Sequence, residues 1–274
     1  MAAFKRNSGS PTRKRFGQHF LEPVWADKVV AAIEPLPDDV MLEIGPGAGI
    51  LTLRLAPRIA RLIAIDIDRD LIAALGPKLP PNASLIAGDV LDIDLADALP
   101  ADASAIRIAG NLPYNISSPI LFRILDLASR RRVKDATLML QREVADRISA
   151  RPNTAEYGVL SVLLQWRTTV DRLLAIPPGA FRPPPDVRSA LIRLTFRPPP
   201  FELADEALFE RMVRSMFTQR RKTLANALAP FAAATAANAA RVAAAAGIDP
   251  RRRPETLEVI EIARLADTFA ASIS

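Results

Sequence analysis

The residues most able to do chemistry are Asn111-Leu112-Pro113-Tyr114, which directly follow an apolar run. They combine a side-chain amide, a proline that stiffens the loop and an aromatic ring. An amide can hydrogen-bond the amino edge of a planar base, and a tyrosine can stack on its face, a contact that contributes about 1–3 kcal/mol per base. This segment therefore predicts a site for a base that carries an exocyclic amine.

The exocyclic nitrogen of adenine is a poor nucleophile because its lone pair is delocalised into the ring. If the Asn111 side-chain carbonyl and the Leu112 backbone carbonyl accept its two N–H bonds, the lone pair can point at an electrophile. Stacking on Tyr114 would hold the nitrogen in line, so catalysis would depend on positioning. The alternative is a loop turned by Pro113 with a half-buried tyrosine.

A glycine-rich turn, Gly45-Pro46-Gly47-Ala48-Gly49, follows another apolar run. Glycines let the backbone approach a ligand where a Cβ atom would collide. The dinucleotide fingerprint needs glycine at position 50, where Ile50 stands, and Pro46 removes an N–H that could bind a pyrophosphate. Asp66 comes 21 residues after Gly45, an offset at which an acid accepts hydrogen bonds from a ribose.

Asp89 follows a third apolar run, where its carboxylate can reach an adenine amino group. The glycine turn, Asp66 and Asp89 together predict a nucleoside ligand at the carboxyl ends of parallel strands. S-adenosylmethionine has ribose hydroxyls and no phosphate, so it fits this site better than NAD does. Transfer of its methyl group to an amine needs no strong general base, because the methylated amine sheds its proton readily.

Two aromatic residues are further candidates. Phe181 lies in the proline-rich segment 180–189, where rigid prolines would hold the ring against the second face of the base. Packing of Phe181 on the core is the alternative. His19, the single histidine, stands between Phe16 and Phe20, and we expect it to line the cofactor pocket rather than to catalyse.

The composition excludes several classes of protein. The chain has 274 residues, half of them hydrophobic and 24% charged, with no cysteine. These values indicate a globular protein with one large domain or a large and a small one. Without cysteine there are no disulfides or thiolate metal sites, and a single histidine disfavours hydrolase triads, so we expect no metal. We see no membrane span or signal peptide and expect a cytoplasmic protein.

Basic residues are clustered along the chain. Lys and Arg number 36 against 30 Asp and Glu, and the sequence pI is about 10.1. Acids dominate residues 61–102, whereas basic clusters lie in residues 1–20, 130–134, 214–222 and 251–253. We interpret the clusters as contacts for a polyanion such as nucleic acid. The alternative for any one cluster is a solvated helix face.

Apolar runs alternate with helical segments from residue 40 onward, a pattern typical of a parallel sheet with helices on both faces. We expect strands at 40–44, 61–65, 84–87, 106–109 and 137–140, and helices at 50–58, from Asp66 to about Gly76, and at 118–129, 142–149 and 156–167. Segments 170–176 and 190–196 predict a hairpin that adds an antiparallel edge to this sheet.

The domain organisation follows from composition. Residues 1–14, rich in Ser, Gly, Pro and basic residues, predict a flexible basic arm, and residues 15–197 the sheet domain. Arg197-Pro198-Pro199-Pro200 predicts a stiff linker. The Ala-, Leu- and Arg-rich segment 202–274 then predicts a small helical domain.

Five blocks of the sequence together resemble the small-subunit ribosomal RNA adenine N6,N6-dimethyltransferase family, of the KsgA type. They are KRFGQHFL (14–21), EIGPGAGILT (43–52), GNLPYNISSPI (110–120), FRPPPDVRSALIRL (181–194) and FTQRRKTLANAL (217–228). DNA and other rRNA adenine methyltransferases share NLPY in outline, whereas the first and last blocks make the match specific.

The resemblance implies an α/β fold, with a Rossmann-like class I methyltransferase sheet and a small C-terminal all-helical domain. It implies an enzyme that uses S-adenosylmethionine to dimethylate two adjacent adenines in the 3′-terminal hairpin of small-subunit rRNA, on the rRNA or on the partly assembled small ribosomal subunit. We expect the enzyme to be a monomer. Matching positions are His19, Leu21, Gly45, Gly47, Asp66, Asp89 and Asn111 for the cofactor, Asn111 to Tyr114 for the target adenine, and Arg220, Arg221 and Lys222 for rRNA phosphates.

Other functions stay open at this point. An assembly or transcription factor could keep the fold without methylating, although the intact 45–49 and 111–114 segments argue for catalysis. A large-subunit rRNA methyltransferase that confers antibiotic resistance would share fold and cofactor, but the last block and the NISSP sequence favour the small subunit. DNA adenine methylation would need a separate target-recognition domain, and none is evident.

Overall fold

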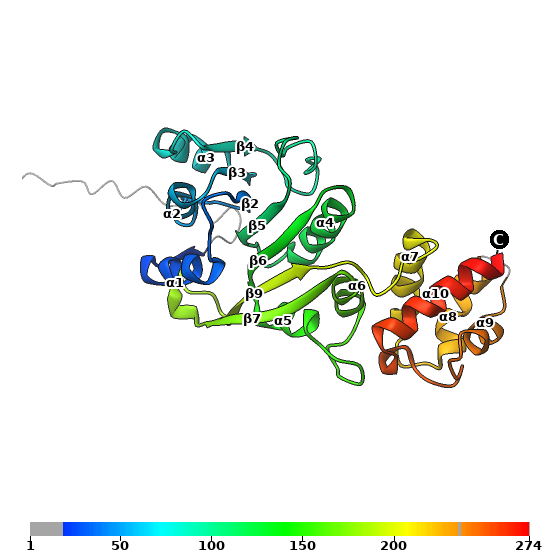
Figure 1. The fold of residues 1–274 in the computed structure, drawn as a ribbon. Coiled ribbons are helices and arrows are strands. Elements are labelled where there is room, and N and C mark those ends of the chain that lie inside the picture. Colours follow the sequence, from blue (N-terminus) through cyan, green and yellow to red (C-terminus); the bar gives the residue numbers. More distant parts are fainter. Residues whose placement is uncertain (1–18, 235–236, 274) are drawn as a thin grey trace, which may run out of the picture.

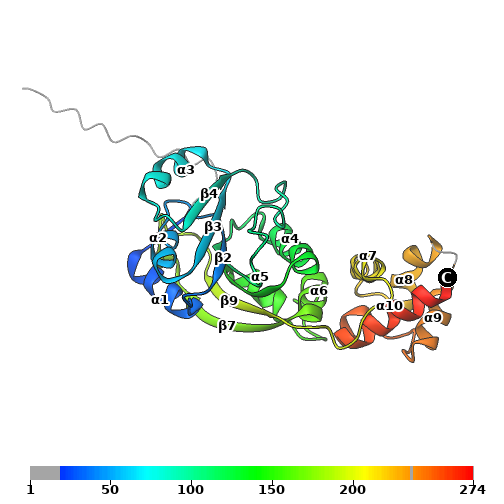
Figure 2. The same cartoon turned by 45° about the horizontal axis from the view of Figure 1, so that its top comes forward.

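The computed structural model describes residues 19–234 and 237–273. The predicted arm at 1–14 lies outside the described residues. The described chain forms two lobes, a larger one built on a β-sheet and a smaller one of helices, which lie beside each other in both ribbon views (Figures 1 and 2).

The larger lobe is organised by a sheet with the strand order β4-β3-β2-β5-β6-β9-β7. The first five of these strands run parallel to their neighbours, and β9 pairs antiparallel with both β6 and β7. The strands are β2 (Val40–Ile44), β3 (Arg61–Asp66), β4 (Ala83–Ala87), β5 (Ile106–Asn111), β6 (Val133–Gln141), β7 (Thr168–Ile176) and β9 (Ser189–Phe196). The predicted parallel sheet with an antiparallel edge is therefore confirmed.

Helices cover both faces of this sheet (Figures 1 and 2). Helix α1 (Pro23–Ile33) and the short α2 (Thr52–Leu55) pack on one face, against side chains such as Met41 and Met139. Helices α4 (Ser117–Arg130), α5 (Arg142–Ile148) and α6 (Val159–Arg167) pack on the other, against Leu42 and Leu138. Successive side chains of a strand point to opposite faces, so continuous apolar runs supply both cores.

Some elements differ from the sequence-based expectations. The expected helix at 50–58 is only α2 followed by a 3₁₀ turn at Ala56–Arg58, because Pro57 lacks the N–H that would continue the α-helix. The segment after Asp66 forms α3 (Arg69–Leu75). Helix α1 and the two-residue strands β1 (Phe20–Leu21) and β8 (Phe181–Arg182) were not predicted, and these two strands pair antiparallel.

The smaller lobe contains α7 (Glu206–Phe217), α8 (Leu224–Ala233), α9 (Ala239–Ala245) and α10 (Val259–Ile273). Its core also takes in Tyr157, Val162 and Trp166, from α6 and the segment before it. Leu160 and Leu164 of α6 belong to the sheet core instead. Helix α6 thus packs into both lobes, and the helical core draws on residues well before the linker predicted at 197–200.

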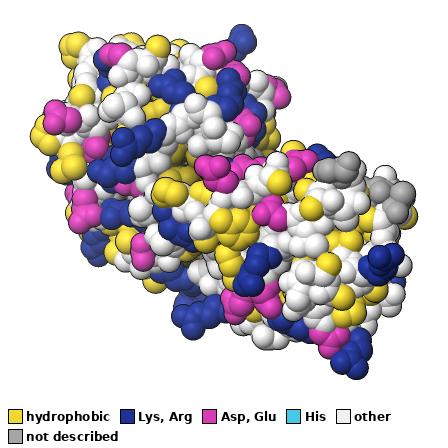
Figure 3. Space-filling model, turned by 45° about the vertical axis from the view of Figure 1, so that its right-hand side comes forward, with side chains coloured by type: hydrophobic (Ala, Val, Ile, Leu, Met, Phe, Trp, Pro, Cys, Tyr) yellow, Lys and Arg dark blue, Asp and Glu magenta, His cyan; other side chains and the backbone are white. Residues whose placement is uncertain are grey.

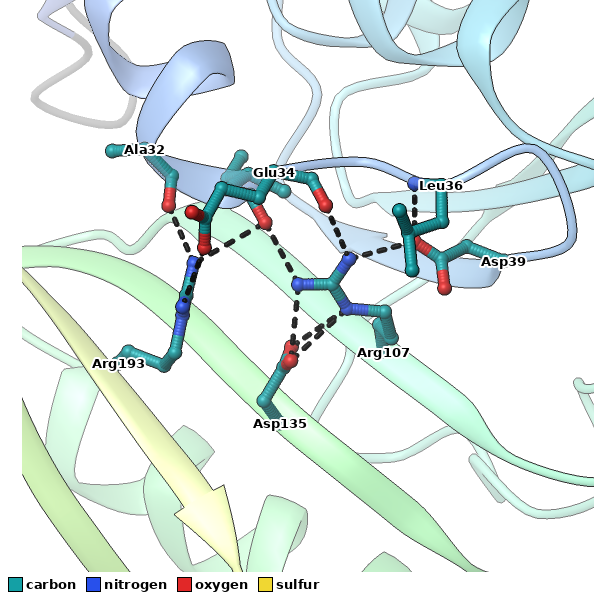
Figure 4. A network of polar contacts seen from close by, with 8 residues as sticks. Ala32, Glu34, Leu36, Asp39, Arg107, Asp135 and Arg193 are labelled. Atoms are coloured by element: carbon teal, nitrogen blue, oxygen red, sulfur yellow. Dashed lines mark hydrogen bonds and ion pairs between the residues drawn. The ribbon is translucent and has the colours of Figure 1, made fainter.

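A buried arginine fastens the end of α1 to the sheet (Figure 4). The Arg107 guanidinium, 4% exposed, donates to the carbonyl oxygens of Ile33 (2.7 Å) and Glu34 (2.9 Å) and pairs with Asp39 (2.6 Å) and Asp135 (3.0 Å). The last carbonyls of a helix have no partner within the helix, so this guanidinium satisfies them. The network lies at the amino-terminal edge of β5 and β6, opposite the candidate site.

Candidate active site

A cavity of about 700 Å³ opens at the carboxyl edge of the sheet. From β2 the strand order proceeds to β3 and β4 on one side and to β5 and β6 on the other, so this edge holds the switch point where open parallel sheets bind ligands. The predicted site residues that line the cavity are His19, Leu21, Gly45, Gly47, Asp66, Asp89, Asn111, Leu112, Pro113 and Tyr114.

The turn after β2 is joined to the end of β3. Gly45 and Gly47 have φ angles of 70° and 56°, in the left-handed region that strains a residue with a Cβ atom. The N–H of Gly47 donates to Oδ2 of Asp66 (2.9 Å), and that of Asp68 donates to Oδ1 (2.9 Å). Each carboxylate oxygen of Asp66 has a further lone pair, so this side chain can accept two hydroxyl donors.

Asp89 lies in the turn after β4 and is half-buried. Its Oδ1 accepts the N–H of Leu91 (2.9 Å), which fixes the side chain. The carboxylate keeps acceptor capacity at Oδ2 toward a ligand in the cavity.

Asn111 is the last residue of β5, and its Nδ2 donates to the carbonyl oxygen of His19 (3.3 Å). This bond orients the amide and leaves its Oδ1 as the acceptor for a ligand. The N–H of Leu112 donates to the carbonyl oxygen of Met139 (3.1 Å), so the loop is anchored to β6. Asn111 is therefore fixed by the hydrogen bond of its own side chain and by the backbone hydrogen bond of the next residue.

Tyr114 is half-buried beside His19, and the two rings stack with centroids 5.8 Å apart and planes at 24°. The Tyr114 hydroxyl lies 2.8 Å from Oγ of Ser189, and Nδ1 of His19 lies 2.7 Å from the carbonyl oxygen of Pro183. Burial raises the pKa of the Tyr114 phenol, so the hydroxyl stays protonated at neutral pH. Sequence reasoning did not identify Ser189 as a partner of this ring.

Glu43 also lines the cavity and was not singled out from the sequence. Its side chain is 1% exposed, and in the described part of the chain its Oε2 has no hydrogen-bond partner. Burial raises the pKa of the carboxyl to about 7, against hydrogen bonds with Thr52 that lower it, and the charge of Asp66 raises it further. The sequence feature that could have identified it is an acidic residue within the apolar run VMLEI (40–44), because a buried carboxyl is typical of a functional site.

Phe181 requires a correction. It is fully buried in β8, where it pairs with Leu21 and packs in the core under α1, and it is absent from the cavity lining. The prediction that it stacks on the base is wrong for this structure. Pairing of β8 with β1 turns the ring inward, and other residues of its segment, Pro183 and Ser189, contact the site instead.

The three basic residues of the last block lie in the turn between α7 and α8. Arg221 and Lys222 are exposed. The Arg220 guanidinium donates to the carbonyl oxygens of Ala155 (2.5 Å) and Tyr157 (3.3 Å), and its side chain is 37% exposed, so its contact with rRNA phosphates stays a prediction.

Several other basic clusters are paired with acids. Arg130 pairs with Asp94 (2.8 Å), and Arg251 pairs with Asp249 (2.9 Å). Figure 3 shows Lys and Arg side chains intermingled with Asp and Glu on the face that it presents. In residues 19–234 and 237–273 there is no group of His, Asp and Glu suited to a metal ion, and no helix of this part is long and apolar enough to cross a membrane.

Comparison with known proteins decides the family. The model of the family described as ribosomal RNA adenine dimethylase matches residues 9–265. The chain belongs to this family. The family member is 46% identical to the "Ribosomal RNA small subunit methyltransferase A" of Xanthomonas campestris over 266 residues, 96% of this chain and 98% of that protein. It is 43% identical to the protein of the same name from Acinetobacter baylyi over 267 residues, 96% and 94% of the two chains.

Solved structures support the same fold. A dimethyladenosine transferase from Plasmodium falciparum superposes with a TM-score of 0.73 at 24% identity, over 90% of this chain and 96% of that one. The 23S rRNA methyltransferase ErmE superposes with a TM-score of 0.66 at 25% identity, over 92% and 99%. The predicted family and fold class are thus confirmed, and this family member is a methyltransferase.

Proposed function

We propose that this methyltransferase transfers methyl groups from S-adenosylmethionine to the N6 amines of two adjacent adenines in the 3′-terminal hairpin of small-subunit rRNA. The observation that carries the proposal is the meeting of the 111–114 segment, the glycine turn and Asp66 in one cavity. The names of the relatives, which specify the small subunit, favour this substrate over large-subunit rRNA.

The charges of the cavity fit S-adenosylmethionine. Asp66 and Asp89 line it, and none of its described lining residues is Lys or Arg. Such a site favours a cationic ligand over one that carries a pyrophosphate. Asp66 would hold the ribose hydroxyls and Asp89 the adenine amine. When bound, this cofactor supplies an electrophilic methyl group.

The residues of the 111–114 segment would then orient the target adenine. Asn111 would accept one N–H of the amine at Oδ1, because its Nδ2 is engaged with His19, and the Leu112 carbonyl would accept the other. The Tyr114 ring would stack on the base. The rate enhancement would come from alignment of the nitrogen rather than from a general base.

The exposed Arg221 and Lys222 of the helical lobe are the proposed contacts for rRNA phosphates. The proposed partners are small-subunit rRNA and the partly assembled small subunit in the cytoplasm, with the protein acting as a monomer. Each phosphate that a basic side chain neutralises steepens the dependence of RNA binding on salt.

The test is to incubate the protein with labelled S-adenosylmethionine and undermethylated small subunits and to map the modified adenines by mass spectrometry. We expect label on two adjacent adenines near the 3′ end of the rRNA. Label confined to large-subunit rRNA or to DNA, or no transfer at all, would overturn the proposal.

A further inference from the structure

The segment between β8 and β9 contacts both aromatic side chains at the cavity. Its Pro183 carbonyl bonds to His19 (2.7 Å), and Ser189, at its end, bonds to Tyr114 (2.8 Å). The two rings come from distant parts of the chain and stack on each other. Phe181, which the sequence predicts to stack on the base, is buried in the core, so the segment contacts the site through these two hydrogen bonds.

Ser189 is a fixed anchor for its hydrogen bond. It is the first residue of β9, and its backbone lies opposite Gln141 of β6 and Ile176 of β7. Its side chain is buried, with the residue 3% exposed. Since β9 is paired on both sides, the Ser189 hydroxyl has little freedom to move with a loop.

Tyr114, in contrast, lies in the turn between β5 and α4, outside any strand or helix. Its ring orientation therefore depends on side-chain contacts. The hydrogen bond to Ser189 holds the phenol oxygen, the atom farthest from the backbone, and thereby restricts rotation of the ring about its side-chain bonds. Contact with His19 restricts the ring from one face.

We propose that Ser189 is a positioning residue for methyl transfer, which sets the plane of the Tyr114 ring and, through stacking, the plane of the target adenine. This inference rests on the proposed function, because the adenine is the ligand that the ring would orient. In this arrangement a residue of the sheet orients a loop residue that would contact the substrate.

The test is a double-mutant cycle with Ser189→Ala and Tyr114→Phe, assayed for methylation of undermethylated small subunits. Removing either hydroxyl should lower kcat by about three- to tenfold, as expected for loss of one neutral hydrogen bond, with the KM for S-adenosylmethionine unchanged. The double variant should be no slower than Tyr114→Phe alone, because both changes remove the same interaction. A merely structural role of Ser189 would give independent, multiplying effects.

A second readout follows the stack directly. In the bound state, the fluorescence of 2-aminopurine at the target position of a hairpin should be lower with the wild-type protein than with Ser189→Ala, because stacking on the Tyr114 ring quenches it. Ser161→Ala is the matched control, since Ser161 is a buried serine that bonds to Arg147 and Gly158 and does not line the cavity. It should lower the melting temperature and leave kcat and the quenching unchanged.

Wild-type kcat in Ser189→Ala, or a double variant slowed by the product of the single effects, would overturn the inference. If Ser189→Ala does not fold, Tyr114→Phe decides, and wild-type kcat in that variant overturns the inference as well. Absence of methylation by the wild-type protein would contradict the proposed function instead, so the two failures are distinguishable.

Discussion

Glu43→Gln should stabilise the protein at alkaline pH and have little effect in acid. The Glu43 carboxyl is buried, and its pKa rises from the usual 4.5 to about 7 because burial disfavours the charged form. A native-state pKa above the unfolded-state value means that the folded protein binds the proton more tightly. The free energy of unfolding therefore decreases as pH rises from about 4.5, and the decrease ends above about pH 7. Glutamine has nearly the same shape and does not ionise.

The size of the effect follows from the shift. A difference of one pKa unit corresponds to about 1.4 kcal/mol, so a shift from 4.5 to about 7 costs about 3 kcal/mol when the group is fully ionised. The Glu43→Gln variant should thus gain up to about 3 kcal/mol in unfolding free energy at pH 8 over wild type. The gain should fall toward zero near pH 4.5, where both side chains are neutral.

Urea denaturation without cofactor, followed by circular dichroism at half-unit steps from pH 4.5 to 8.5, measures this difference. The slopes with denaturant should match, since neither state changes its exposed surface. Glu202→Gln is the control, because Glu202 is exposed and its replacement should change stability by no more than a few tenths of a kcal/mol. A stability difference for Glu43→Gln that stays flat with pH, or a loss at pH 8, would refute the burial argument.

Further expectations concern the site, the core and the RNA contacts. Asn111→Ala should abolish methyl transfer with the cofactor Kd within about tenfold, or roughly 1.4 kcal/mol, and unchanged turnover would remove this amide from the mechanism. Asp66→Ala should weaken cofactor binding in calorimetry, and an unaltered Kd would contradict the ribose assignment. Arg107→Ala leaves Asp39, Asp135 and the carbonyl oxygens at the end of α1 without their partner, so the unfolding free energy should fall by about 3–5 kcal/mol. A loss below about 1 kcal/mol would show that the network contributes little. Neutralising Arg221 and Lys222 together should reduce the slope of log K against log salt for RNA binding by about 1–2, and an unchanged slope would show that they face elsewhere.

The sheet was predictable because its strands are apolar runs that end at a turn residue or a polar residue. Val40–Ile44 ends before Gly45 and Arg61–Asp66 ends at Asp66, and so the positions of these strands could be inferred. The strands β1 and β8 could not, because a two-residue strand has no periodicity and forms only against its partner. Helix α6 was expected, but its sequence does not reveal that its two faces belong to different lobes.

The site was predictable where function depends on position along a strand. Asp66 and Asn111 end their strands, and parallel strands end at a common edge, so these residues had to meet. Phe181 failed because a proline-flanked ring has the same sequence whether exposed or buried, and long-range pairing decides between the two. The hydrogen bonds of Arg220 could not be predicted for the same reason, since its partner carbonyls at Ala155 and Tyr157 are distant in sequence.

The distribution of charge suits the cavity and the surface to different ligands. The overall charge is +6, yet the cavity is lined by carboxylates and its described lining contains no Lys or Arg. An RNA phosphate would be repelled at Asp66 and Asp89, whereas a neutral base would enter without that cost. The same carboxylates would attract the sulfonium group of the proposed cofactor. If the exposed Arg221 outside the cavity holds the RNA backbone as proposed, the target adenine would have to leave its stack to reach Asn111.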